Sequence, residues 1–176
     1  FVLSGNHEFY KGEYNAVNEA INSICDKHES LEFLNARSVM LEGIKVIGAC
    51  MWSFAPSKEA KDDIGHKLND YRYIKIKEGD DEPRVITPDD TNKWFEAESK
   101  FIKAEIAKAK EENQQVIVLT HHAPVIGMGC SNPDFWNSLT NHAFGTNLRE
   151  LFGSPVSLWC YGHTHWFHDM VIDGTR

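Results

Sequence analysis

Three short apolar runs, each followed at once by polar, histidine-containing residues, constrain this sequence most. Residues 1–4 precede Gly5-Asn6-His7-Glu8, residues 116–120 precede His121-His122-Ala123-Pro124, and residues 158–161 precede Gly162-His163-Thr164-His165. Short runs rich in Val, Leu, Ile and aromatic residues, bounded by turn residues, are typical of strands in a sheet covered on both faces. In open α/β sheets, ligands bind just beyond the carboxyl ends of the strands. The sequence therefore predicts that three motifs far apart in the chain form one site.

The residue types in these motifs are suited to a metal ion. Neutral imidazole binds Zn, Fe, Mn and Ni, and the side-chain oxygen of Asn6 is a harder ligand. His163 and His165 are two residues apart, so in an extended segment they share a face. None of the three motifs contains cysteine, which argues against a closed structural zinc site.

Taken together, the motifs resemble those of the calcineurin-like metallophosphoesterase superfamily, which has a dinuclear metal centre. Asn69-Asp70-Tyr71-Arg72, Thr87-Pro88-Asp89-Asp90-Thr91 and Gly174-Thr175-Arg176 are similar to a branch of uncharacterised, mostly single-domain phosphoesterases. The resemblance implies an α/β fold, a four-layer α/β/β/α sandwich formed by a single domain over residues 1–176, with the metals at one rim. It also implies hydrolysis of a phosphomonoester or phosphodiester.

The resemblance assigns roles to five residues. Asn6, His121 and His163 correspond to ligands of one metal, and His165 to a ligand of the other. His7 corresponds to the catalytic histidine beside the scissile phosphate, where it assists the leaving oxygen. The metal pair is left open among Mn, Fe, Zn, Ni and Mg, because imidazole with amide and carboxylate oxygens admits them all.

Two further family motifs, Asp-x-His and Gly-Asp-x-x-Asp, lie upstream in relatives and supply the remaining ligands, including the bridging aspartate. Neither occurs before Gly5 in this sequence. We therefore expect a chain truncated at both ends, which alone binds at most one metal weakly and has little or no activity.

Each assignment has an alternative. A histidine at a strand end is often only a hydrogen-bonded loop residue, and Asn6 can stabilise a tight turn. His7 can serve only to position Asn6. His122 faces substrate or is structural, and it is left out of the metal set. For the whole chain, the alternatives are a degenerate scaffold that binds other proteins, and a mononuclear or non-hydrolytic metal-binding protein.

Composition narrows the partners. The net charge of −8 argues against a general nucleic-acid-binding surface, because Lys and Arg make most phosphate-backbone contacts. A small phosphate ester or a phosphoprotein remains compatible with this charge, since bound metals dominate the local field of such a site. No apolar run is long enough to span a membrane. The four cysteines show no CxxC spacing, which favours a reducing compartment such as the cytoplasm.

Local patterns predict alternating helices and strands. Helices are expected over 13–28, from Thr87-Pro88 to about 112, and briefly near 145–152. Residues 53–86 are expected to be irregular, with a surface loop at 79–83. Glu42-Gly43 is expected to form a hairpin turn. Strands are expected at 31–34, 39–41, 44–52, 115–120, 156–161 and 168–172.

Overall fold

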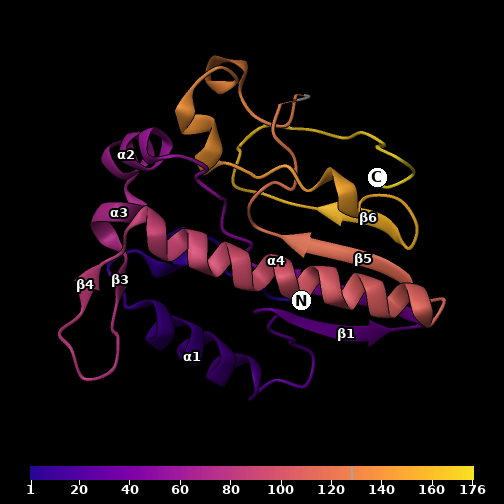
Figure 1. Ribbon diagram of the computed structural model, residues 1–176. Coiled ribbons are helices and arrows are strands. Elements are labelled where there is room, and N and C mark those ends of the chain that lie inside the picture. The colour runs from indigo at the N-terminus through magenta and orange to yellow at the C-terminus, as the bar shows by residue number, and fades with distance from the viewer. Residues whose placement is uncertain (128) are drawn as a thin grey trace.

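A four-stranded sheet lies at the centre of the computed structural model, which describes residues 1–127 and 129–176 (Figure 1). Its strand order is β1-β2-β5-β6. β1 is antiparallel to β2, whereas β2, β5 and β6 are parallel. The strands span Arg37–Leu41 (β1), Ile44–Ala49 (β2), Gln115–Thr120 (β5) and Val156–Cys160 (β6). The carboxyl ends of three strands therefore lie at one edge of the sheet.

The hairpin between β1 and β2 turns where the sequence predicts it. Leu41 pairs with Ile44, so Glu42 and Gly43 form a two-residue loop. Both have positive φ, 49° at Glu42 and 86° at Gly43. Two successive positive φ values match the right-handed twist of the strands they connect, and glycine adopts one of them without strain. β2 ends at Ala49, three residues earlier than expected.

Helix α4 (Pro88–Glu111) packs against β2 and β5 and runs along the strands on one face of the sheet (Figure 1). It begins at the expected residue. The carboxylate of Asp90 accepts a hydrogen bond from the backbone nitrogen of Thr87 at 2.8 Å, which satisfies a donor at the helix start. Phe95, Ile102 and Ile106 are buried in the core that α4 shares with the sheet.

Helix α1 (Tyr14–Cys25) confirms the helix predicted over 13–28 and lies beside α4 (Figure 1). The carboxylate of Glu13 accepts hydrogen bonds from the first backbone nitrogens of the helix. The ring of Tyr14 stacks on Trp94 of α4, with centroids 3.8 Å apart. Phe9 and Trp52 pack beside this pair in the main core.

The prediction that residues 53–86 are irregular is wrong. They contain α2 (Lys58–Lys67), α3 (Asp70–Tyr73) and a two-stranded sheet of β3 (Lys75–Ile76) and β4 (Arg84–Val85). α2 is mostly polar, and its buried stripe consists of only Ala60 and Ile64. A stripe this narrow gives a weak periodic signal, which explains the error. Residues 79–83 form an exposed loop, as expected.

Three smaller predictions also need correction. The strand expected at 31–34 is a single bridge between Val2 and Phe33, and the strand at 168–172 is a single bridge between Ile172 and Thr175. The helix near 145–152 is one 3-10 turn, η4 (Arg149–Leu151). The other 3-10 turns are η1 (His7–Phe9), η2 (Pro133–Phe135) and η3 (Leu139–Ala143). Isolated bridges of this kind leave no regular pattern in a sequence.

The predicted α/β class is confirmed by the mixed sheet and the helices that pack on it. Within residues 1–127 and 129–176, no helix combines the length and apolar character that crossing a bilayer requires. Cys25, Cys50 and Cys130 are buried as free thiols, whereas Cys160 is exposed at the end of β6.

Candidate functional site

Backbone hydrogen bonds join the loops that leave the three parallel strands. The backbone nitrogens of His121 and His122 both donate to the carbonyl of Cys50, just beyond β2, at 3.1 and 3.2 Å. The backbone nitrogen of Gly162, just beyond β6, donates to the carbonyl of His121 at 3.0 Å. These bonds fix the two histidine motifs side by side at the carboxyl edge of the sheet.

Three of the predicted metal ligands converge at this edge. Nε2 of His121 lies 2.9 Å from Oδ1 of Asn6 and 3.1 Å from Nδ1 of His163. Ligand atoms about 2.1 Å from one ion, at right angles to each other, are ~3 Å apart. Both distances from Nε2 of His121 therefore fit neighbouring positions around one divalent ion.

Two of these side chains, His163 and Asn6, are each hydrogen-bonded through the polar atom that does not approach His121. These bonds fix which atom faces the other ligands. Nε2 of His163 lies 3.2 Å from the carbonyl of Ala143, so it carries the proton and leaves Nδ1 with a free lone pair. Nδ2 of Asn6 donates to Oδ1 of Asp70 at 2.8 Å. Because the nitrogen of the amide is held by Asp70, its oxygen is directed toward His121.

Burial keeps both histidines neutral. It lowers the pKa of His121 to about 4 and that of His163 to about 3. Electrostatic interactions with His7 and His165 act on both pKa values in the same direction as burial. At neutral pH the imidazoles of His121 and His163 therefore offer lone pairs and not additional protons.

His7 and His165 flank this centre as exposed residues. His7 opens η1, and its ring packs on Tyr10 with centroids 4.6 Å apart. The roles of His7 in catalysis and of His165 in binding a second metal remain predictions. His122, left open by the sequence, is 1% exposed and packs against His163 and Trp52, with centroid distances of 4.1 and 5.2 Å. The ring of His122 therefore helps to hold the ring of His163 in place.

The backbone around the site is unusual. His163 and His165 have φ of 62° and 50°, in the left-handed region that residues with a side chain rarely adopt. Such strain is found mainly where it positions functional groups. At Gly5, an added Cβ would lie 2.5 Å from Cε1 of His121. Only glycine therefore fits between this backbone and the imidazole.

Within the described residues, no group of three or more His, Cys, Asp and Glu side chains is arranged to hold a metal ion. The convergent set is consistent with this finding, because it has two imidazoles and one amide oxygen. Since a weak ligand set of this kind holds a divalent ion less firmly than one with carboxylates, we expect modest affinity.

Sequence reasoning did not identify Asp70 as part of the site. This residue is 3% exposed and accepts hydrogen bonds from Asn6 and Tyr10. The motif around it was noticed only as a family resemblance. Arg72, in the same motif, donates to the carbonyl of His66 at 2.6 Å and not to the site.

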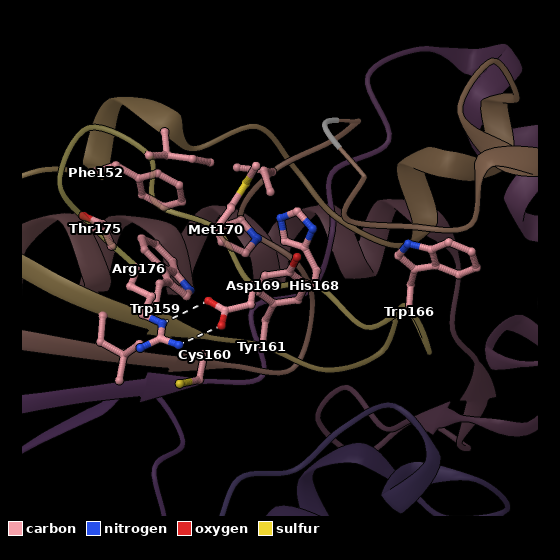
Figure 2. A pocket seen from close by; sticks show the side chains of 14 residues that line it. Phe152, Trp159, Cys160, Tyr161, Trp166, His168, Asp169, Met170, Thr175 and Arg176 are labelled. Carbon is pink, nitrogen blue, oxygen red and sulfur yellow. Dashed lines mark hydrogen bonds and ion pairs between the residues drawn. The ribbon is translucent and has the colours of Figure 1, made fainter.

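A separate cavity of about 270 Å³ lies between β6 and the segment 166–176 (Figure 2). Trp159, His168 and Met170 line it, and Asp169 forms an ion pair with Arg176 at 2.7 Å. None of the three convergent ligands is among its lining residues. The candidate site is therefore located by its converging ligand atoms and not by this cavity.

Comparison with known proteins agrees with the motifs. The model of the calcineurin-like phosphoesterase family matches residues 1–167. The uncharacterized protein L509 of Acanthamoeba polyphaga mimivirus is 32% identical over 184 residues, which cover 99% of this chain. The chain spans 64% of the length of that viral protein. No solved structure matches the chain. Because the family model covers nearly the whole chain, this protein belongs to the calcineurin-like phosphoesterase family.

Proposed function

We propose that this chain carries part of the metal centre of a phosphate-ester hydrolase, with two divalent ions in the active form. The observation that carries the proposal is the convergence of Asn6 Oδ1 and His163 Nδ1 on His121 Nε2, at 2.9 and 3.1 Å. In this assignment these three residues hold one ion and His165 contributes to the other. A bound divalent ion supplies Lewis-acid chemistry, which neutralises charge on the phosphoryl oxygens.

The residues of the chain divide the remaining work. Asn6, His121 and His163 fix the position of the phosphoryl group relative to the sheet edge. His7, exposed beside them, donates a proton to the oxygen of the leaving group. Its ring is held by Tyr10, so the donor is directed without being buried. The substrate is a phosphomonoester or phosphodiester, either as a small molecule or on a protein.

The test is to measure hydrolysis and metal content together in the protein as its gene encodes it. The assay compares p-nitrophenyl phosphate with bis(p-nitrophenyl) phosphate in the presence of Mn²⁺. We expect His7→Gln to lower turnover by roughly a hundredfold or more with metal content unchanged, because His7 transfers a proton and binds no metal. His121→Ala should lose both metal and activity. His28→Ala, at an exposed position outside the motifs, is the matched control and should change neither.

The alternatives give different results. Activity that needs no metal, or that survives His121→Ala, contradicts the proposal. No bound ion and no hydrolysis of either ester indicate a degenerate scaffold. One bound ion without hydrolysis indicates a mononuclear metal-binding protein. Loss of metal from His7→Gln would reassign that residue as a ligand.

A further inference from the structure

Asp70, at the start of α3, is a buried carboxylate in an unusual setting. It is 3% exposed, and among the ion pairs between described residues none involves it. Its Oδ1 accepts two hydrogen bonds, from Nδ2 of Asn6 and from the hydroxyl of Tyr10, both at 2.8 Å. A buried carboxylate without a cation is costly unless donors or a nearby positive charge compensate it. The two donors come from the loop that carries Asn6 and His7.

We propose that Asp70 is a positioning residue of the metal centre, which orients Asn6 as a ligand and supports His7 through Tyr10. This inference rests on the proposed function. The nitrogen and oxygen of the Asn6 amide are bonded to the same carbon in one plane. A hydrogen bond from the nitrogen to Asp70 therefore fixes the direction of the oxygen. That oxygen lies 2.9 Å from Nε2 of His121. A metal ion held by Asn6 would also supply positive charge near Asp70, which forms no ion pair with another described residue.

Asp70 also supports His7 through Tyr10. Its hydroxyl is bonded to Asp70, and its ring packs against His7 at 4.6 Å and edge-on against Tyr73 at 5.7 Å. Fixing the hydroxyl therefore fixes the ring on which His7 rests. One carboxylate oxygen thus holds two neighbouring residues with different assigned roles, Asn6 for the metal and His7 for the leaving group.

The backbone around Asp70 is rigid enough for this task. The backbone nitrogen of Lys11 donates to the carbonyl of Tyr73 at 2.7 Å, and that of Lys75 donates to the carbonyl of Gly12 at 3.0 Å. α3 is therefore fastened to the loop after His7.

The experiment measures three quantities in Asp70→Asn, Asp70→Ala, Tyr10→Phe and Tyr71→Phe. They are Mn²⁺ affinity by calorimetry, the side-chain amide NMR signals of Asn6 without metal, and kcat and KM of the protein as its gene encodes it. The Asn6 signals are identified by their loss in Asn6→Asp. Tyr71→Phe is the matched control, because it removes a hydroxyl from α3 that bonds to Thr91 and not to the site.

Removal of the carboxylate should lower Mn²⁺ affinity by about 10- to 100-fold, the usual effect of losing a partner behind a metal ligand. We expect Asp70→Ala to show this and to shift the Asn6 signals, with Asp70→Asn intermediate because its oxygen can still accept. Tyr10→Phe should keep Mn²⁺ affinity within about twofold and lower kcat with little change in KM. Tyr71→Phe should change none of these quantities.

The outcomes separate this inference from the proposed function. Unchanged Asn6 signals in both folded Asp70 variants overturn the positioning role, whether or not the protein hydrolyses phosphate esters. If the Asn6 signals shift in the Asp70 variants while the wild-type protein shows no activity, the positioning of Asn6 is supported and the phosphoesterase proposal is contradicted. If Asp70→Ala does not fold, Asp70→Asn decides by the same two measurements. An equal loss of kcat in Tyr71→Phe and Tyr10→Phe overturns the proposed support of His7 by Asp70 through Tyr10.

Discussion

Gly5 shows how one missing side chain supports the site. A Cβ at this position would lie 2.5 Å from Cε1 and 2.6 Å from Nδ1 of His121, closer than atoms can approach. We predict that Gly5→Ala displaces the imidazole and lowers Mn²⁺ affinity by roughly tenfold or more, as measured by calorimetry.

Gly65→Ala is the control for this substitution. Gly65 lies in α2, and an added Cβ there would be 3.4 Å from the nearest atom, in Pro88. Alanine should stabilise the helix by roughly 0.5–1 kcal/mol and leave Mn²⁺ affinity unchanged. Equal affinity in the two variants would show that the His121 ring has room to move and that the close packing at Gly5 is not required.

Among single residues, the sequence predicted those whose type and position in the chain both indicated a site. Asn6, His121 and His163 were predicted as neighbours because each follows an apolar run, and the structure brings them together. Their metal-binding role stays a prediction. Asp70 could not be found this way, because an acid at the start of a helix is common in itself. Its contact with Asn6 joins residues 64 positions apart, which only the folded chain reveals.

Helix α4 contains a buried acid, Glu98, whose carboxylate accepts a hydrogen bond from the backbone nitrogen of Trp52 at 3.1 Å. Burial raises the pKa of Glu98 from 4.5 to about 7, although bonds from the backbone of Trp52 and Met51 oppose the shift. Between these two values, unfolding releases a proton that the folded state retains. The free energy of unfolding therefore falls as pH rises from about 4.5 to 7, with no further fall from this group above that range.

Glu98→Gln tests this linkage. Glutamine is uncharged and its oxygen can accept the same backbone hydrogen bond. We predict that the variant loses this pH dependence and, at pH 8, exceeds the wild type in stability by on the order of 3 kcal/mol at most. Urea unfolding at several pH values measures it. Glu96→Gln, at an exposed position of the same helix, should behave as the wild type. A wild-type slope retained in Glu98→Gln would show that other groups cause the dependence.

The elements differed in how far the sequence predicted them. α4 was predicted because a proline at its first position, acids in its first turn and a long apolar stripe agree. The same stripe includes position 98, so a charged residue among Phe95, Ile102 and Ile106 was a visible sign of a buried acid. α2 was missed because only two buried apolar residues stand in an otherwise charged and polar sequence. Single bridges, such as that of Val2 with Phe33, depend on tertiary contacts alone.

For the whole molecule, the sheet explains why distant segments share one site. Parallel strands β2, β5 and β6 end at the same edge, and the loops that follow them are bonded to each other. The ends of β5 and β6 at this edge were predictable from the apolar runs that precede His121 and His163. The run at residues 1–4 was also expected to be a strand, but it forms only a single bridge between Val2 and Phe33. The loops of residues 129–144 were not predictable, because the turns and 3-10 segments there follow no regular period.

The net charge of −8 also acts at this scale. A negatively charged protein repels anionic substrates at long range, so recognition of a phosphate ester depends on positive charge concentrated at the site. In this account the metal ions provide that charge. The metal centre is therefore the central claim.

Anomalous X-ray scattering from crystals grown with Mn²⁺ or Zn²⁺ tests that claim most directly. The account predicts a peak about 2.0–2.3 Å from Asn6 Oδ1, His121 Nε2 and His163 Nδ1, absent in His121→Ala and present in His28→Ala. Wild-type crystals at millimolar metal that show no peak between these three atoms, or a peak only at other residues, would contradict it.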